Sequence, residues 1–272
     1  MYAVCLEVLM NNYVPVDGLL NGRVIIVTGA GEGIGRCAAV EFARLGAEVV
    51  LLGRTQRKLE GVYDEIVDSG YKEPVIHPMD LLTAKGRDYQ DFAQRLKESL
   101  GRLDGILHNA AELDILTPIQ YYDEELWESA MKVNVTAPYL LTQACLPLLL
   151  ASEDASIVFI TDDCAREAKG YWGAYAVSKA AVQHLGLTLA IELQNTNVRV
   201  NVINPGPCRT GMRVRTHPGA SIMSVPPPIA IMPLYEYLLG PDSKNTRGQI
   251  MNARDWLDAE HDDRQIVAVL EQ

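Results

Sequence analysis

Short apolar runs alternate with longer stretches of helical apolar spacing between residues 24 and 206. This alternation is typical of parallel strands joined by helices that lie on both faces of the sheet. The predicted strands are Val24 to Thr28, Glu48 to Leu52, Pro74 to Met79, Gly105 to His108, Ser156 to Ile160, Val198 to Ile203 and, more weakly, Gln249 to Ala253. The predicted helices are Gly35 to Leu45, Thr55 to Ser69, Lys85 to Leu100, Glu124 to Ala151 and Tyr175 to Gln194. The pattern therefore predicts a doubly wound α/β fold with a mainly parallel sheet.

No linker, low-complexity segment or internal repeat divides the chain, so residues 1–272 are predicted to form a single domain. Three segments lie outside the repeating pattern. Residues 1–22 are interpreted as an N-terminal arm, 211–233 as a substrate loop or lid, and 255–272 as an acidic C-terminal tail. The part from His217 to Pro233 is rich in proline, glycine and small residues, which argues against a regular helix or a central strand.

The charge balance argues against two classes of partner. The chain has 24 Lys and Arg against 35 Asp and Glu, a net charge of −11, so it has no bulk attraction for nucleic acid or for an anionic membrane. The most apolar stretch, Tyr139 to Ala151, is interrupted by polar residues and proline and is too short to span a bilayer. We therefore expect a cytoplasmic protein with no nucleic-acid or membrane partner. The five cysteines and five histidines show no metal-ligand spacing, so no metal site is predicted.

The first predicted strand runs directly into the glycine-rich turn TGAGEGIG at residues 28–35. Gly29, Gly33 and Gly35 allow a tight turn and let the backbone approach a pyrophosphate, whose charge is favoured at the N-terminus of the following helix. A tight strand-to-helix connection without a ligand has the same pattern. The turn alone therefore leaves both interpretations open.

The second predicted strand ends in Gly53 and Arg54, about twenty residues after the glycine turn. In dinucleotide-binding folds an acidic residue here binds the ribose 2′-hydroxyl, whereas an arginine without such an acid suits the 2′-phosphate of NADP. A guanidinium can hold phosphate through paired donors. Arg54 therefore favours NADP(H) over NAD(H), although an exposed loop arginine has the same signature. Arg36, Arg57 and Lys58 are candidate helpers.

Tyr175 and Lys179 in the motif YAVSK are spaced i, i+4, which places both side chains on one face of a helix. A phenol with its ordinary pKa near 10 exchanges protons poorly at neutral pH unless a nearby ammonium stabilises the phenolate. Lys179 can supply that charge. An ordinary surface pair has the same spacing, but the position after the fifth predicted strand favours a functional pair.

Together these motifs resemble those of the short-chain dehydrogenase/reductase family, and over about 180 residues they occur in the family's order and at the family's spacing. The motifs are TGAGEGIG at 28–35, Asp80 after the third predicted strand, HNAA at 108–111, Asn134, YAVSK at 175–179 and NPGPCRT at 204–210. The surrounding text, including LDGILHNA and IMPLYEYLLG, is similar to the YciK-type branch of the family. The resemblance implies a Rossmann-type fold that binds its cofactor across the carboxyl ends of the strands.

The resemblance also implies roles for single residues. Tyr175 would be the general acid or base at the substrate oxygen, and Lys179 would lower its pKa and bind the nicotinamide ribose. Asn134 would hold the water through which Lys179 is reprotonated. The cofactor-binding residues would be Gly29, Gly33, Ile34, Gly35, Arg54, Asp80, Leu81, Asn109, Ala110, Tyr175, Lys179, Pro205, Gly206 and Thr210.

One departure from the family pattern concerns the catalytic serine, which usually lies thirteen residues before the tyrosine and is here replaced by Asp162. An ionised carboxylate only accepts hydrogen bonds, and its charge would oppose both a developing alkoxide and a Tyr175 phenolate. Three alternatives are open: a protonated Asp162 that donates, a hydroxyl supplied by Thr161, or cofactor binding without turnover. A milder departure is Ala111, where the family usually has glycine.

The favoured function is that of an NADP(H)-dependent oxidoreductase, transferring hydride between nicotinamide and a small carbonyl or alcohol substrate. The alternative is a non-catalytic NADP-binding protein, a sensor or assembly partner, because Asp162 occupies the usual serine position. The helices Glu124 to Ala151 and Tyr175 to Gln194 resemble those through which family members pair, so a homodimer or homotetramer is expected. Apolar residues of the lid indicate either a hydrophobic portion of the ligand or packing on the core.

Overall fold

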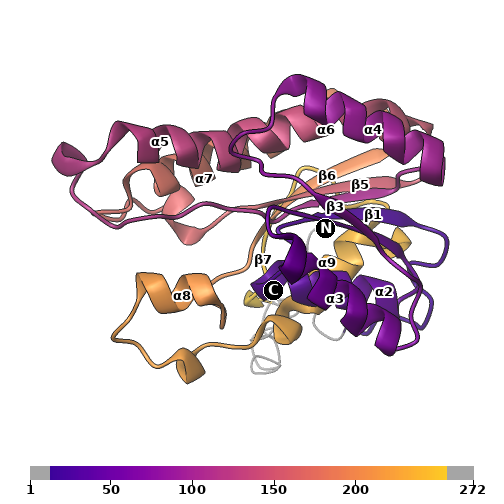
Figure 1. Cartoon of the computed structure of the whole chain (residues 1–272), viewed down its shortest axis with the longest axis horizontal. Helices are drawn as coiled ribbons and strands as arrows, with labels where there is room; N and C mark the ends of the chain where they lie inside the picture. Colours follow the sequence, from indigo (N-terminus) through magenta and orange to yellow (C-terminus); the bar gives the residue numbers. More distant parts are fainter. Residues whose placement is uncertain (1–12, 256–272) are drawn as a thin grey trace, which may run out of the picture.

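The computed structural model describes residues 13–255 and is built around a seven-stranded parallel sheet (Figure 1). The strand order is β3-β2-β1-β4-β5-β6-β7, and every neighbouring pair is parallel. The strands are β1 Val24–Thr28, β2 Glu48–Gly53, β3 Val75–Pro78, β4 Gly105–His108, β5 Ala155–Ile160, β6 Val198–Asn204 and β7 Ile250–Asn252. Each predicted strand matches within one residue at either end, and the predicted fold class is confirmed.

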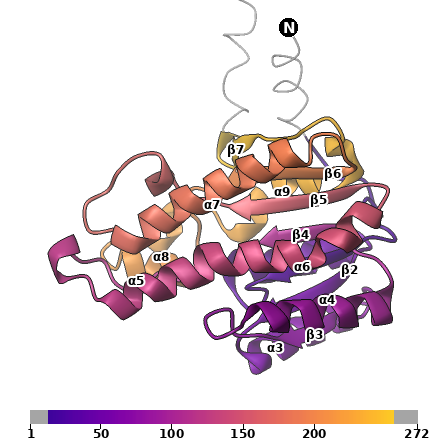
Figure 2. The same cartoon turned by 90° about the horizontal axis from the view of Figure 1, so that it is seen from above.

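Helices cover both faces of the sheet (Figure 1), and Figure 2 looks down on one of these helical layers. The helices are α2 Gly33–Arg44, α3 Gln56–Asp68, α4 Gly86–Leu100, α5 Glu124–Met131, α6 Ala137–Ala151, α7 Gly173–Glu192, α8 Gly211–Thr216 and α9 Met232–Leu239. Along β1, Ile25 and Val27 pack in the cluster that includes α2, α3 and α9, whereas Val24 and Ile26 pack in the cluster that includes α4, α6 and α7. Since side chains alternate along a strand, β1 is apolar throughout because both of its faces are buried.

Helix α9 corrects the end of the predicted lid, because Met232 and Pro233 begin a helix there instead of ending a loop. A proline in the first turn removes no helical hydrogen bond, so it does not prevent this start. Leu234, Tyr235 and Leu238 are fully buried against the sheet. Before α9, the proline-rich segment from residue 217 to residue 231 forms only short 3₁₀ turns, at Ile222–Ser224 and Pro228–Ile231.

Helices α5 and α6 are joined by a π-helical turn, Lys132–Thr136, and make one helix from Glu124 to Ala151. With 28 residues, this helix is long and apolar enough by length and composition to cross a membrane, which the shorter stretch considered in the sequence is not. Its buried side chains, including those of Leu141 and Cys145, pack with α4 and the sheet. The core helix of a soluble protein passes the same test, and 44% of the apolar window is buried inside the structure.

The residues before β1 lie against the end of the chain that follows α9. The Tyr13 hydroxyl donates a hydrogen bond of 2.9 Å to Asp242, and its ring meets the Tyr237 ring edge-on. Leu19 and Leu20 are buried in the core. The first part of the predicted arm, residues 1–12, and nearly all of the predicted acidic tail, residues 256–272, lie outside the described residues.

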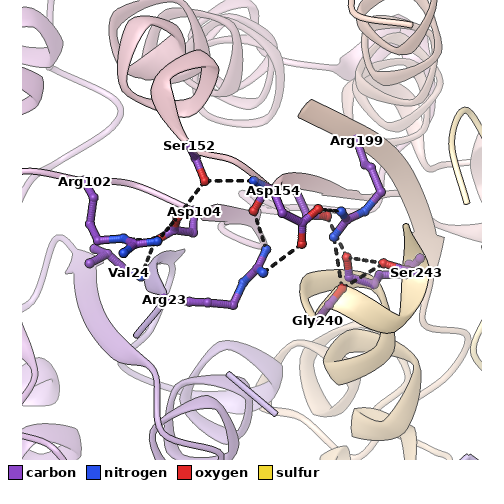
Figure 3. Close-up of polar contacts among 11 residues, drawn as sticks. Arg23, Val24, Arg102, Asp104, Ser152, Asp154, Arg199, Gly240 and Ser243 are labelled. Atoms are coloured by element: carbon purple, nitrogen blue, oxygen red, sulfur yellow. Dashed lines mark hydrogen bonds and ion pairs between the residues drawn. The ribbon is translucent and has the colours of Figure 1, made fainter. Parts of the chain in front are cut away.

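Figure 3 shows a polar network at the amino ends of the central strands. The Asp154 carboxylate accepts hydrogen bonds from Arg23, at 2.9 Å, and from Arg199. Asp104 accepts a hydrogen bond of 2.7 Å from the Ser152 hydroxyl. The Arg199 side chain is only 1% exposed, so water cannot compensate its charge. Asp154 therefore pairs with two arginines at the end of the sheet opposite the carboxyl ends.

Candidate functional site

The carboxyl ends of the strands border a cavity of about 330 Å³. It opens where the strand order reverses, between β1 and β4, which is where doubly wound folds bind ligands. The predicted site residues that line it are Gly29, Gly33, Ile34, Arg54, Asp80, Leu81, Asn109, Ala110, Asp162, Tyr175, Lys179, Pro205, Gly206 and Thr210. The structure thus brings together segments that follow six separate strands, β1 to β6, and one face of α7.

The glycine turn is shaped by close contacts between backbone segments. Gly29 and Gly33 have φ angles of +67° and +58°, in the left-handed region that side chains disfavour. Gly35 does not line the cavity; a Cβ there would lie 2.3 Å from the carbonyl oxygen of Gly29. Gly35 is therefore needed to let the first turn of α2 pack beneath the loop, which leaves the loop backbone facing the cavity.

Thr28 ties the end of β1 to the end of β4. Its hydroxyl donates to the carbonyl of Leu107 at 3.2 Å and accepts from the backbone N–H groups of Asn109 and Ala110, each at 3.0 Å. The Asn109 side chain donates in return to the Thr28 carbonyl at 3.1 Å. Asn109 thus fixes the two strand ends relative to each other, and its amide group holds the backbone of the glycine turn.

Arg54 lies at the rim of the cavity, where its side chain is 66% exposed. Its Nη1 atom is 3.6 Å from the Glu112 carboxylate, on the segment that follows β4. Of the candidate helpers, Lys58 lines the cavity and pairs with Glu32 of the glycine turn, whereas Arg36 pairs with Glu65 outside it. Two cations, each beside a carboxylate, therefore face the part of the cavity next to β2.

Asp80 and Leu81 follow β3 and line the same part of the cavity as Arg54. One Asp80 carboxylate oxygen accepts from the backbone N–H of Leu82 at 3.0 Å, which makes the residue part of a strand-end turn. The side chain is nevertheless exposed at the cavity wall. Asp80 can therefore both stabilise the turn after β3 and contact a ligand in the cavity.

Tyr175 and Lys179 project from one face of α7 into the cavity and are both buried. The Lys179 ammonium donates to the carbonyl of Ile160 at 2.9 Å and lies 5.5 Å from the centre of the Tyr175 ring. Burial lowers the pKa of Lys179 to about 8, with the charge of Asp162 acting in the opposite direction. A lysine with this pKa can exchange a proton near neutral pH.

Asp162 lies two residues after the end of β5, and its carboxylate accepts from the backbone N–H of Cys164 at 3.0 Å. Burial, and then the negative charge of Asp162, raises the pKa of Tyr175 well above its usual value. Thr161 does not supply the alternative hydroxyl, because its Oγ1 lies 3.1 Å from Gln183 and 3.3 Å from the carbonyl of Lys179. Asp162 is therefore the side chain that faces Tyr175 where the family pattern has serine.

Asn134 is buried in the π-helical turn and does not line the cavity. Its side-chain oxygen accepts from the backbone N–H of Glu112 at 2.6 Å, and its amide donates to the Glu112 carbonyl and to Ser178, each at 2.9 Å. Both amide donors are therefore used by protein groups. In this structure the Asn134 side chain fixes the loop after β4 against α7.

The segment after β6 closes the cavity from the side of the lid. Gly206 has a φ angle of +63°, and Thr210 caps α8 by accepting from the backbone N–H of Arg213 at 3.4 Å. A Cβ at Gly33 would lie 3.4 Å from the Thr210 methyl group, so the start of α8 rests on the glycine turn. The cavity is therefore bounded by the glycine turn and by the lid.

The sequence motifs did not reveal the part of the cavity wall next to Tyr175. It is lined by Lys169, Trp172, Met212, Arg213, Arg215, Thr216 and His217. These residues belong to the loop before α7 and to the lid, where no motif marks them; the only signal is the basic text GMRVRTH at 211–217. The apolar lid residues Ile222, Met223, Val225, Ile229 and Ile231 do not line the cavity, and Val225 and Ile231 are buried in packing.

His108 packs at the strand end, as its sequence position suggested. Its ring stacks on Phe159 with 4.6 Å between centroids, its Nε2 lies 2.8 Å from the Thr142 hydroxyl, and burial lowers its pKa to about 3. Between residues 13 and 255, no group of three or more His, Cys, Asp or Glu side chains is arranged to hold a metal ion.

Comparison with known proteins agrees with this geometry. The sequence signature of the family described as short chain dehydrogenase matches residues 23–220. Over 243 residues the chain is 43% identical to the uncharacterized oxidoreductase YciK of Escherichia coli K12, which covers 89% of this chain and 96% of that protein.

Two solved structures described as short chain dehydrogenases are similar in fold and sequence. One, from Shigella flexneri and complexed with NADP, has a TM-score of 0.86 and 43% identity over 88% of this chain and 100% of its own. The other, from Escherichia coli CFT073 and complexed with NADPH, has a TM-score of 0.86 and 44% identity over 88% and 100%. Because the signature spans most of the chain and its relatives align over nearly all of it, the protein belongs to the short chain dehydrogenase family, among its oxidoreductases of the YciK type.

Proposed function

We propose that the protein is an NADP(H)-dependent oxidoreductase that interconverts a small carbonyl compound and its alcohol. The observation that carries the proposal is that Tyr175 and Lys179 line the same cavity as the glycine turn and Arg54. The crystallisation of two similar proteins with NADP and NADPH supports the choice of cofactor.

The residues present fit a dinucleotide. The backbone of Gly29 and Gly33 faces the cavity at the start of α2, where N–H groups and the helix dipole favour phosphate. Asp80 and Leu81 would border the adenine, and Arg54 with Lys58 would hold the 2′-phosphate. When bound, the nicotinamide ring supplies or accepts the hydride.

In this proposal the protein's own groups handle the proton. Tyr175 donates a proton to the substrate oxygen during carbonyl reduction and removes it during alcohol oxidation. Lys179 lies beneath the phenol ring and stabilises the phenolate, since its ammonium is the nearest buried cation. Asn134 acts by positioning, because its side chain holds the loop of Glu112 against α7.

The test of the function is NADPH oxidation across a panel of aldehydes and ketones, with the wild type and Asp162→Ser measured side by side. We expect the wild type to turn over. A silent wild type with an active Asp162→Ser variant would support the alternative, a protein that binds NADP without chemistry. A protein that binds neither NADPH nor NADP would contradict both functions.

The pH dependence of alcohol oxidation tests the role of Asp162. Because its negative charge raises the pKa of Tyr175, the neutral variant Asp162→Asn lowers that pKa and makes the phenolate available at lower pH. The rise of kcat/KM with pH should move to lower pH by about one unit or more. An unchanged profile would show that the Asp162 charge does not act on the catalytic base.

The choice of cofactor is tested at Arg54. Arg54→Ala should weaken NADPH binding by roughly tenfold or more, because a charge-assisted contact with the 2′-phosphate is lost, and should leave NADH binding within about twofold. Arg57→Ala is the matched control, since Arg57 is exposed three residues later, in the first turn of α3, and does not line the cavity. Equal losses for both cofactors would show that Arg54 does not read the 2′-phosphate.

We also propose a cytoplasmic homodimer or homotetramer in which the long helix Glu124–Ala151 and α7 form the contact. Exposed apolar side chains on these helices, including Tyr139, Val177 and Ile191, support it. Light scattering after gel filtration should give a multiple of the 30.0 kDa chain mass. A single-chain mass at micromolar concentration would contradict the proposal.

A further inference from the structure

We infer that the substrate carries an anionic group, a carboxylate or a phosphate, separated from its reacting carbon by an apolar portion. This inference deepens the proposed oxidoreductase function and rests on it. It comes from the part of the cavity wall formed by Lys169, Trp172, Met212, Arg213 and His217, which we call the basic wall.

The basic wall surrounds the Trp172 ring. The centroid of that ring lies 5.8 Å from that of Tyr175 and 6.1 Å from that of His217. The Lys169 ammonium lies 5.4 Å from the Trp172 centroid, and Nη1 of Arg213 lies 3.3 Å from Nε2 of His217. A ligand that contacts Tyr175 and extends along Trp172 would therefore meet Lys169 and Arg213.

The lysine and arginine of the basic wall form no ion pair within the described part of the chain. Among residues 13–255, no carboxylate lies within 4.0 Å of a charged nitrogen of Lys169, Arg213 or Arg215, all of which line the cavity. The whole chain has a net charge of −11, so its general composition does not explain this gathering of cations. Cations that line one side of a cavity raise the local concentration of anions and stabilise them there.

His217 is placed to orient Arg213. Burial and the charges of Arg213 and Lys169 lower the pKa of His217, so its ring is neutral at neutral pH. A neutral Nε2 accepts from the guanidinium, while Nδ1 lies 2.9 Å from the Thr216 hydroxyl. Arg213 is thus held at the cavity wall with donors left for a ligand.

The position of the anionic group follows from the neighbours of Tyr175. The Asp162 charge beside the phenol disfavours a second carboxylate next to the reacting carbon. Met212, whose sulfur lies 3.9 Å from the Tyr175 hydroxyl, and Trp172 provide apolar surface between Tyr175 and the cations. A chain with a terminal anion fits this order of surfaces, whereas a 2-oxo acid does not.

The experiment compares two ligands of similar size and different charge, hexanoate and hexanamide, by calorimetric titration into protein saturated with NADP. Hexanoate should bind roughly tenfold or more tightly than hexanamide, because charge-assisted hydrogen bonds to Arg213 are available to it alone. Arg213→Gln should abolish this preference and leave the affinity for NADP unchanged. The control is Arg166→Gln, which changes an exposed arginine of the loop before α7 that does not line the cavity, and this variant should keep the preference.

A third ligand, hexyl phosphate, distinguishes the two anions: whichever of phosphate and carboxylate binds more tightly identifies the group. Equal affinities for hexanoate and hexanamide, or binding of no ligand, would overturn the inference. So would an equal loss of hexanoate and NADP affinity in Arg213→Gln, because the cations would then belong to the cofactor. These titrations need no turnover, so failure of every carbonyl to oxidise NADPH would overturn the oxidoreductase proposal separately.

Discussion

Tyr175→Phe is expected to lower kcat for carbonyl reduction by about 10²–10⁴-fold, because the phenol that exchanges the proton with the substrate oxygen is removed. The ring itself is kept, so its packing with Leu113 and Cys164 should persist. NADPH binding, measured by fluorescence, should therefore change much less than turnover. Steady-state kinetics with the best substrate of the carbonyl panel gives the comparison.

The matched control for this change is Tyr171→Phe. Tyr171 lies four residues earlier, is 63% exposed and does not line the cavity, so its hydroxyl has no role in the proposed chemistry. The control variant should keep wild-type kinetics. A fully active Tyr175→Phe variant would remove Tyr175 from the mechanism.

Asp154→Ala should be the most destabilising single substitution proposed in this article, at a cost of about 3–5 kcal/mol in the free energy of unfolding. The reason is that Asp154 accepts hydrogen bonds from both Arg23 and Arg199, and the side chains of these arginines are 10% and 1% exposed. Without the carboxylate, Arg199 keeps a buried charge, and between residues 13 and 255 its remaining hydrogen-bond acceptor is the Gly240 carbonyl. Urea denaturation followed by circular dichroism measures the loss.

Asp91→Ala is the matched control, because it also removes an aspartate that pairs with an arginine. Its partner Arg87 lies 3.8 Å away, but the two side chains are 56% and 87% exposed, so the pair is screened by water. The change should cost less than about 1 kcal/mol. If both variants lost the same stability, burial would not be the source of the Asp154 effect.

The sheet was predictable because its signal is local. Strands such as β1 and β2 are nearly continuous apolar runs, and burial on both faces requires that pattern whatever the rest of the chain does. Helix α9 was not predictable in the same way. Its eight residues begin at Met232, which a proline follows directly, and they are apolar on most sides, so the helix depends on packing against β5 and α2.

The site residues also fall into those that could be located from the sequence and those that could not. The glycine turn, Arg54, Tyr175 and Lys179 could be located from the sequence, because each has a fixed spacing from a strand end. The basic wall could not, because Lys169 and His217 lie far apart in the sequence and meet only through the ring of Trp172. The hydrogen-bond partners of the Asn134 and Thr161 side chains also could not be predicted from the sequence, because they depend on tertiary packing.

Stability and ligand binding are located at opposite ends of the sheet, and this separation affects how evolution or design can alter the protein. The Asp154 network stands at the amino ends of strands four to seven residues long, and the cavity stands at the other ends. At about 3.3 Å per residue, most of these strands are longer than the distance within which two substitutions usually affect each other's free energy. Substitutions in the lid can therefore change the substrate specificity without disturbing the buried arginines that stabilise the fold.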